Sequence, residues 1–269
     1  MKIKFWGVRG SFAATTEEFS KYGGNTSCVE IIEGQTQIIL DAGTGIRNLG
    51  KKNPLRQQKV YHILLSHYHL DHISGLPFFR PIHQKNITLN LYGPSSPQQT
   101  IITLFSKEFF PVAFRSLAAK VRFHPLSLKK FHIGPFTITS IPINHPNPTL
   151  GYFIETHQHR IAYLTDHEPI RQFRHLRQSP DTYEASLLHL LKGTDLLIQD
   201  AQFTDANYPA HRGWGHTSWS DAIRLAEKVG VKKLIFFHHD PDQTDQSLDR
   251  ETKKFPEIHL AKEGETLCL

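Results

Sequence analysis

The 269-residue sequence contains only two cysteines, Cys28 and Cys268. The two could pair, but they do not suggest a disulfide framework, and a chain this poor in cysteine is typical of a reducing compartment. No segment approaches the roughly 18 consecutive apolar residues that a membrane span needs. Residues 1–7 also lack the apolar core and cleavage site of a secretory signal. The sequence therefore predicts a cytoplasmic protein without a membrane segment.

Flexible linkers are missing as well. No low-complexity or Gly/Ser-rich tract interrupts the chain, so a single domain over residues 1–269 is expected. Apolar runs typical of buried strands are interspersed with helical patterns, which predicts an α/β class with sheets covered by helices. Strands are expected at residues 2–7, 28–32, 37–41, 62–66, 87–92, 136–141, 150–155, 160–164, 196–200 and 233–238, and helices at residues 97–107, 184–191 and 244–254.

The clearest helix signal begins at Ser218. Asp221 stands three residues later, as in a capping box. From Ala222 onward, apolar residues follow at the i, i+3, i+4, i+7 spacing of a helix face, and Gly230 supplies a residue suited to end the helix.

Positive charge predominates, with a net charge of +6 and a pI of about 9.2. Lys and Arg gather between Arg115 and Lys130 and between Arg160 and Arg177. Each cluster is either a solvated basic face or a surface for an anionic partner, and the sequence leaves both interpretations open.

Among 18 histidines, those at positions 67, 69 and 72 are distinguished by their spacing. Together with Asp71 they directly follow the apolar run 63–65. His67 and His69, two apart in an extended segment, point the same way and can converge on one metal ion. Asp71 and His72 come as the chain turns into a short helix, so they can serve a second ion. A chance cluster is a poor explanation for three histidines and an aspartate at these offsets.

The run His67-x-His69-x-Asp71-His72 resembles the signature of the metallo-β-lactamase superfamily, whose fold is a four-layer αββα sandwich. The family's later ligands find counterparts in His145, Asp166 and either His238 or His239, of which His238 is favoured because it ends its strand. Asp41, in an Asp-x-Gly turn, resembles the residue that orients a metal-binding histidine. The resemblance implies one ion on His67, His69 and His145, a second on Asp71, His72 and His238, and Asp166 as the bridge. Zn²⁺ is the default for nitrogen and oxygen ligands, and Mn²⁺ or Fe²⁺ also suits them.

Two such ions lower the pKa of a bridging water and generate a hydroxide nucleophile. Asp71, as an oxygen ligand, favours a filled second site, which suits phosphodiester cleavage. His216, just ahead of the helix after Ser218, resembles the catalytic histidine of a phosphodiesterase branch that contains ribonuclease Z and cyclic-phosphate diesterases. It would donate a proton to the leaving oxygen or bind phosphate. A histidine that merely caps or packs is the alternative.

Only 20 residues separate His145 from Asp166. Ribonuclease Z carries a long tRNA-gripping arm in this interval, so its shortness argues against tRNA as the substrate. The expected activity is hydrolysis of a small or cyclic phosphodiester. The alternatives are a carboxylic ester, lactone or thioester hydrolase, and a metal-binding module without catalysis. Relatives in this superfamily often dimerise, so a homodimer is one expected assembly.

Overall fold

The computed structural model describes residues 1–52, 59–169 and 180–269. The chain divides into two compact units. The first contains Met1–Ala14, Gly23–Leu126 and Lys262–Leu269, and the second contains Thr15–Tyr22 and Ser127–Ala261. A single domain over the whole chain stays a prediction. The basic cluster expected between Arg160 and Arg177 lies outside the described residues from position 170 onward.

The first unit is built on one mixed sheet. Its described strands follow the order β14-β1-β2-β3-β4-β5-β6, antiparallel from β14 to β3 and parallel from β3 to β6. The strands are β1 (Lys2–Gly7), β2 (Cys28–Glu33), β3 (Thr36–Leu40), β4 (Val60–Leu64), β5 (Thr88–Pro94), β6 (Lys120–Leu126) and β14 (Thr266–Cys268). The helices are α1 (Ile46–Lys52), α2 (Leu70–Ile73) and α3 (Pro97–Leu104). Apolar side chains of α1 and α3 join those of β3 to β5 in one buried cluster.

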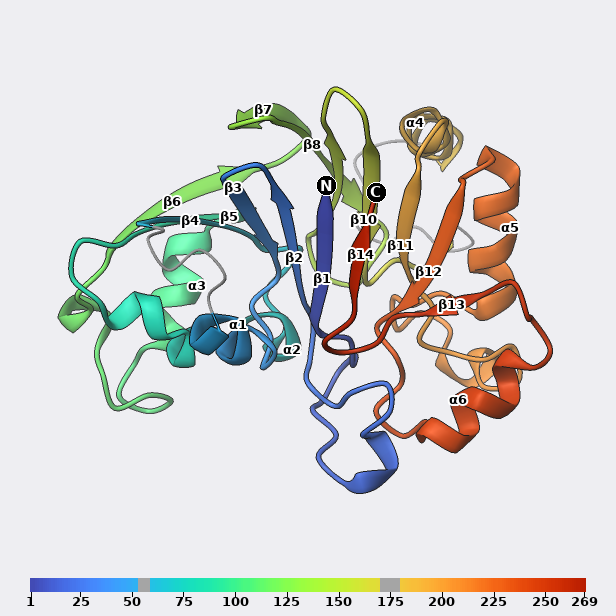
Figure 1. The fold of residues 1–269 in the computed structure, drawn as a ribbon, viewed down its shortest axis with the longest axis horizontal. Helices are drawn as coiled ribbons and strands as arrows, with labels where there is room; N and C mark the ends of the chain where they lie inside the picture. The colour runs from blue at the N-terminus through green and yellow to red at the C-terminus, as the bar shows by residue number, and fades with distance from the viewer. Residues whose placement is uncertain (53–58, 170–179) are drawn as a thin grey trace. The chain divides into compact units, whose positions relative to one another are not determined.

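The second unit repeats this plan with a second mixed sheet. Its described strands follow the order β13-β12-β11-β10-β9-β8-β7, antiparallel from β7 to β10 and parallel from β10 to β13. The strands are β7 (Lys129–Ile133), β8 (Phe136–Ile143), β9 (Thr149–Glu155), β10 (Arg160–Leu164), β11 (Leu196–Asp200), β12 (Lys233–Phe237) and β13 (His259–Leu260). The helices are α4 (Pro180–Leu191), α5 (Trp219–Val229) and α6 (Asp245–Thr252) (Figure 1).

The helix expected after Ser218 is confirmed as α5. The Ser218 side chain accepts a hydrogen bond from the backbone N–H of Asp221, and Gly230 closes the helix in the left-handed conformation. Ala222 and Ala226 face the core, and the helix lies along β11 and β12 (Figure 1).

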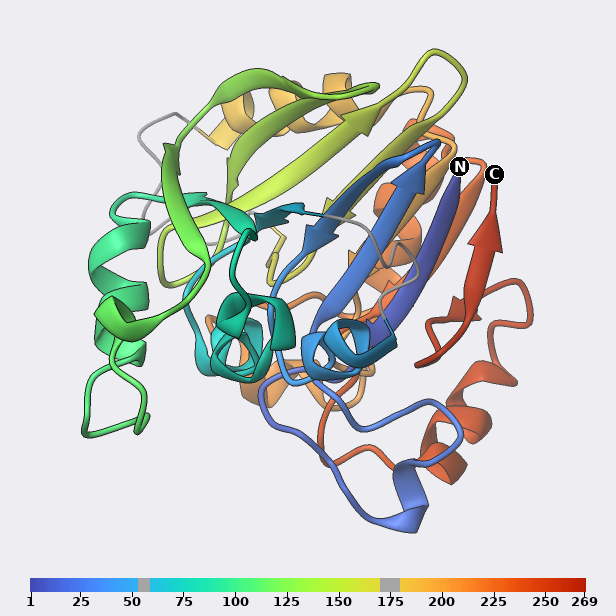
Figure 2. The ribbon, with the colours of Figure 1, turned by 60° about the vertical axis from the view of Figure 1, so that its left-hand side comes forward.

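A short N-terminal segment belongs to the second unit because it is tied to α6. The 3-10 turn Glu17–Phe19 lies beside α6 (Figure 2), and the Tyr22 hydroxyl donates a 2.7 Å hydrogen bond to Asp249. Lys21 extends this contact with an ion pair to the same carboxylate.

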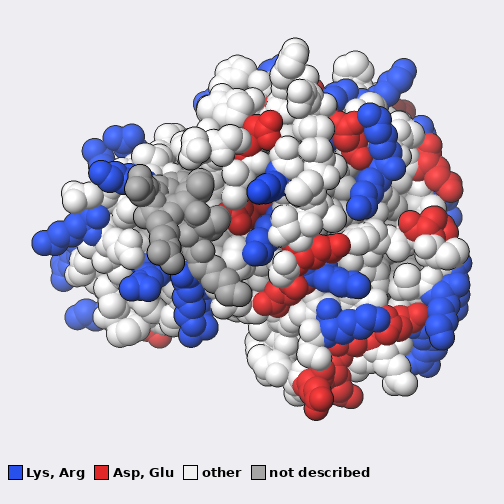
Figure 3. All heavy atoms as spheres, viewed as in Figure 1, with Lys and Arg blue, Asp and Glu red and all other residues white. Residues whose placement is uncertain are grey.

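All ten expected strands are present, with ends that differ by up to two residues. Four strands were not predicted: β6, β7, β13 and β14. β6 and β7 are edge strands with exposed Lys and Arg, and β6 also contains Pro125, so their sequences resemble loops. They carry the lysines and arginines of the basic cluster between Arg115 and Lys130 except Arg115, which lies in the 3-10 turn Phe114–Ser116. Over the helices of the second unit, Lys and Arg are intermingled with Asp and Glu (Figure 3), as in the ion pair of Lys228 with Glu184.

No helix in the described part of the chain is both long enough and apolar enough to cross a membrane. The parallel strands matter for function because the carboxyl ends of neighbouring parallel strands meet at one edge of a sheet. In both units, the residues predicted to bind metal follow strands at such an edge.

Candidate metal and catalytic site

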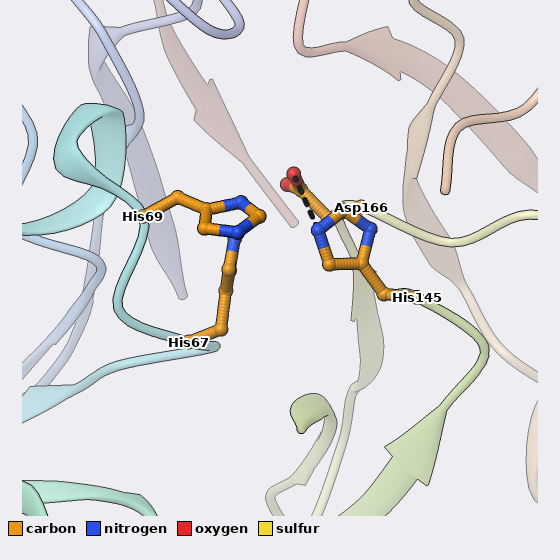
Figure 4. A group of neighbouring side chains, drawn as sticks. All are labelled: His67, His69, His145 and Asp166. Atoms are coloured by element: carbon orange, nitrogen blue, oxygen red, sulfur yellow. Dashed lines mark ion pairs between the residues drawn. The ribbon is translucent and has the colours of Figure 1, made fainter. Parts of the chain in front are cut away.

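The first unit brings the predicted ligands of its sequence motif together on the segment that runs from the end of β4 into α2. His67 and His69 stand edge to face with 4.4 Å between ring centroids, and the His67 ring is 4.3 Å from that of His72 (Figure 4 shows His67 and His69). Nε2 of His72 lies 3.1 Å from Oδ2 of Asp71. The backbone N–H of Ser11 donates a 2.8 Å hydrogen bond to the same Asp71 oxygen. The motif therefore forms a compact set of imidazole and carboxylate donors.

Asp41, directly after β3, orients this set. It accepts hydrogen bonds from Nδ1 of His72 (2.9 Å) and from the backbone N–H of Ser66 (2.7 Å). The Ser66 hydroxyl also donates to Asp41 and lies 3.1 Å from Nδ1 of His67, from which it can accept. One fully buried carboxylate thus holds two imidazoles, one directly and one through a hydroxyl. The expectation that Asp41 orients a histidine is confirmed.

Three site residues adopt the left-handed backbone conformation without being glycine. The φ angles are 60° at Asp41, 52° at Asp166 and 63° at His238. Each costs about 1–3 kcal/mol, and strain of this kind concentrates at functional sites. All three follow a strand that pairs in parallel with a neighbour.

The second unit supplies His145 after β8, Asp166 after β10 and His238 after β12, each buried. Nε2 of His238 lies 3.3 Å from Oδ2 of Asp166, and Nε2 of His145 lies 3.9 Å from Oδ1 of Asp166, the contact dashed in Figure 4. Nδ1 of His238 donates to Oε1 of Gln202 (3.0 Å). Asp166 is therefore approached by two imidazoles.

His239, the alternative last ligand, points elsewhere. Its Nε2 donates a 2.9 Å hydrogen bond to the carbonyl oxygen of Ala261, and its ring stands edge-on to Tyr22. This geometry favours His238 as the ligand, which stays a prediction.

A loop that precedes α5 holds His145 in place. Nδ1 of His145 donates to the carbonyl oxygen of Gly215 (3.0 Å). Gly215 has a φ of 94°, and a Cβ atom there would lie 2.0 Å from Nδ1 of His145, so only glycine fits. The Glu168 carboxylate accepts hydrogen bonds from the backbone N–H groups of Gly213 (2.8 Å) and Gly215 (3.0 Å).

Tyr208 adds a third bond to the same carboxylate, donating from its hydroxyl to Glu168 over 3.0 Å. Burial, and next the Glu168 charge, raise the pKa of Tyr208, so the hydroxyl stays protonated and able to donate. Glu168 therefore fixes the loop that fixes His145.

His216 lies among the ligands of the second unit and is paired with Asp200, the last residue of β11. Nδ1 of His216 donates a 2.8 Å hydrogen bond to Oδ2 of Asp200. The His216 ring stacks on that of His238, with 5.1 Å between centroids and 20° between planes. Asp200 is itself held by the backbone N–H of Gln202 at 2.9 Å. A carboxylate on Nδ1 leaves Nε2 as the nitrogen that exchanges a proton with a ligand.

The hydrogen bonds of the histidines test whether these residues fit a metal. His72 and His238 each commit the Nδ1 proton to an acceptor, so in the neutral ring the Nε2 lone pair faces a carboxylate oxygen at 3.1–3.3 Å. Such a contact is unfavourable unless a positive charge lies on or next to the ring. Imidazole nitrogens and carboxylate oxygens are ligands that suit Zn²⁺, Mn²⁺ or Fe²⁺. The residues therefore fit a divalent cation.

Comparison with known proteins identifies the family. The Beta-lactamase superfamily domain matches residues 36–239, about three quarters of the chain. The chain belongs to the β-lactamase superfamily. It is 24% identical to a ribonuclease Z from Bacteroides fragilis (strain YCH46), over 97% of this chain and 96% of that protein. It is 26% identical to the probable metallo-hydrolase YhfI of Bacillus subtilis (strain 168), over 98% of each chain. The solved structure of a diphosphatase from the PhnP family has a TM-score of 0.74 at 19% identity, covering 100% of this chain and 97% of that one.

These matches confirm the metallo-β-lactamase fold, with mixed sheets flanked by helices, and the similarity to ribonuclease Z. They also confirm the prediction of a metal-dependent hydrolase.

Several contributors were missed from the sequence. Asp200 was not predicted as a site residue, although it ends β11 much as Asp166 follows β10, and that similarity was the available signal. Glu168 and Gln202 act through partners more than 30 residues away, so no local pattern marks them. Ser66 stands next to the motif and carries no signal of its own.

Proposed function

We propose that the protein is a two-metal phosphodiesterase that acts on small or cyclic phosphodiesters. His67, His69 and His145 would bind one ion, Asp71, His72 and His238 the other, and Asp166 both. Support comes from the superfamily membership, from the donor sets of the two units and from the Nδ1 hydrogen bonds that direct Nε2 toward carboxylates. When bound, the ions would neutralise charge on the phosphoryl oxygens and activate a water.

The observation that carries phosphodiester chemistry is the pair of His216 and Asp200. Expulsion of an alkoxide needs a proton, and Asp200 stabilises the imidazolium form of His216 that can deliver it from Nε2. Asp71, held by the backbone of Ser11, provides an oxygen ligand for the second ion.

The hairpin after His145 argues against tRNA as the substrate. The interval between His145 and Asp166 is occupied by β9 and β10, which pair as an antiparallel hairpin. No segment remains there for a tRNA-binding arm. We also propose the cytoplasm as the compartment, because Cys28 and Cys268 are both thiols. A homodimer stays a prediction.

The test is hydrolysis of bis-p-nitrophenyl phosphate by protein whose zinc, manganese and iron content has been measured. Turnover that a chelator abolishes and one of these metals restores is the expected result. p-Nitrophenyl acetate, which shares the leaving group, is the comparison substrate for a carboxylic ester. A diester rate no higher than the background with every metal, together with rapid ester hydrolysis, would replace this function by carbonyl hydrolysis.

A further inference from the structure

One exposed aromatic side chain, Trp214, lies two residues before the proposed proton donor in the sequence. The Trp214 side chain is 60% exposed, whereas Trp6 and Trp219 are 4% and 1% exposed. Exposure of an indole to water is unfavourable, because its burial contributes more free energy than the burial of most other side chains.

Trp214 ends a chain of ring contacts that leads to His216. Its ring stands edge-on to His211, with 4.8 Å between centroids. The His211 ring stacks on Phe203 at 4.3 Å and 15°, and Phe203 contacts His216 at 5.8 Å. Trp214 and His216 are also only two residues apart, so their Cα atoms are separated by at most about 7.6 Å. These contacts and the short backbone separation place the indole near His216.

The loop that bears Trp214 is held by hydrogen bonds on both sides of the indole. Glu168 accepts hydrogen bonds from the residues on both sides of it, Gly213 and Gly215, and Gly215 is locked against His145. The backbone N–H of Trp214 donates to the carbonyl oxygen of His211. A preorganised ring binds a planar ligand without the entropic cost of ordering a mobile loop.

The surroundings favour a small planar ligand over a protein or a membrane. Among the described residues of the second unit, the only other exposed large apolar side chain is Leu128, in the turn before β7. A macromolecular interface needs a contiguous apolar patch of several hundred Å². Here the neighbours are His211 and the exposed cation Arg212, whose guanidinium lies 5.9 Å from the Tyr208 ring centre.

We propose that Trp214 stacks on the nucleobase of the substrate, which makes nucleotide diesters the preferred substrate class. This inference rests on the proposed phosphodiesterase function. Base stacking on an aromatic side chain depends on the ring face and tolerates any base. Diesters that carry a nucleobase, whichever it is, should therefore be preferred over diesters without one.

The kinetic test compares two diesters with the same leaving group: thymidine 5′-p-nitrophenyl phosphate and methyl p-nitrophenyl phosphate. The metal-loaded wild type should prefer the thymidine diester. Trp214→Ala should reduce the ratio of the two kcat/KM values about 5- to 100-fold, mainly through KM for the thymidine diester. Trp214→Phe should retain most of the ratio. Phe109→Ala, which removes a ring that is 71% exposed in the first unit, should leave the ratio unchanged.

A binding test separates failure of this inference from failure of the proposed function. Because the other two tryptophans are buried, adenosine monophosphate should quench the fluorescence of Trp214 saturably, whereas ribose 5-phosphate should not. The inference is overturned if the two phosphates quench alike, or if both diesters are cleaved with a ratio that Trp214→Ala does not change. Selective quenching without turnover of either diester would instead reject the phosphodiesterase and keep the nucleotide site.

Discussion

Replacing Asp200 by asparagine should separate the role of His216 from that of the metal ligands. Asparagine matches the shape of aspartate, and its oxygen can still accept the Gln202 backbone N–H. The amide NH₂ would then stand where Oδ2 accepts the Nδ1 proton of His216. Because both groups would be donors, the imidazolium form of His216 would lose its stabilising partner.

The magnitude is worked from the contact with His216, although Oδ2 of Asp200 also accepts the backbone N–H of His167 at 3.3 Å. The bond is 2.8 Å long between side chains that are 7% exposed at His216 and 0% at Asp200. A hydrogen bond to a charged group contributes about 1.5–3 kcal/mol. Loss of this stabilisation raises the free energy of the imidazolium that donates the proton. If that form is needed only for the proton-donating step, kcat should fall about 10- to 150-fold.

The leaving group decides whether this loss reports proton donation. p-Nitrophenolate departs without a proton, so Asp200→Asn should affect its release only slightly. A diester with an alkoxide leaving group needs the proton, and here the full loss is expected. His216→Ala should show the same dependence, and the double variant should be no worse than His216→Ala, because the residues act as one unit.

Asp205→Asn is a matched control. Asp205 is exposed in the same unit and bonds only to Ser220 in the described contacts, so kcat should not change for either diester. Equal losses of Asp200→Asn on both leaving groups would refute proton donation and assign His216 to phosphate or metal binding. A variant with unchanged kcat on the alkoxide diester would refute the pairing itself.

Three further outcomes test the rest of the site. Gly215→Ala should lower the amount of bound metal and the activity, because the added Cβ would collide with His145. Gly213→Ala has open space around its Cβ, so it should lower only the free energy of unfolding, by the left-handed strain of about 1–2 kcal/mol, measured by thermal unfolding. His238→Ala should lose metal measured by atomic emission, whereas His239→Ala should keep it and lose only stability through its bond to Ala261; the reverse result would exchange the two residues. Removing metal with a chelator should lower Tm because buried donors are left facing one another, and an unchanged Tm would contradict the fit of these residues to a cation.

Sequence pattern was sufficient to predict the helices and strands that are determined by interactions within a few residues. The capped helix α5 was predicted from Ser218 to Gly230 because capping and side-chain periodicity act within a few residues. The buried strands were recognisable because short continuous apolar runs are typical of strands covered on both faces. Edge strands such as β6 were not, since their identity comes from a neighbour that pairs with them.

The motif of residues 67–72 determined by itself that this protein carries imidazole and carboxylate donors at metal-binding spacing, and it indicated the family. Tertiary structure decided how those donors are used. The turn at His238 depends on a left-handed backbone conformation. The hydrogen bonds from Gly215 to Glu168 and from His216 to Asp200 join residues that lie far apart in the sequence. Spacing can state which atoms are able to bind a cation. Which nitrogen of each imidazole is turned toward it depends on acceptors that only folding brings near.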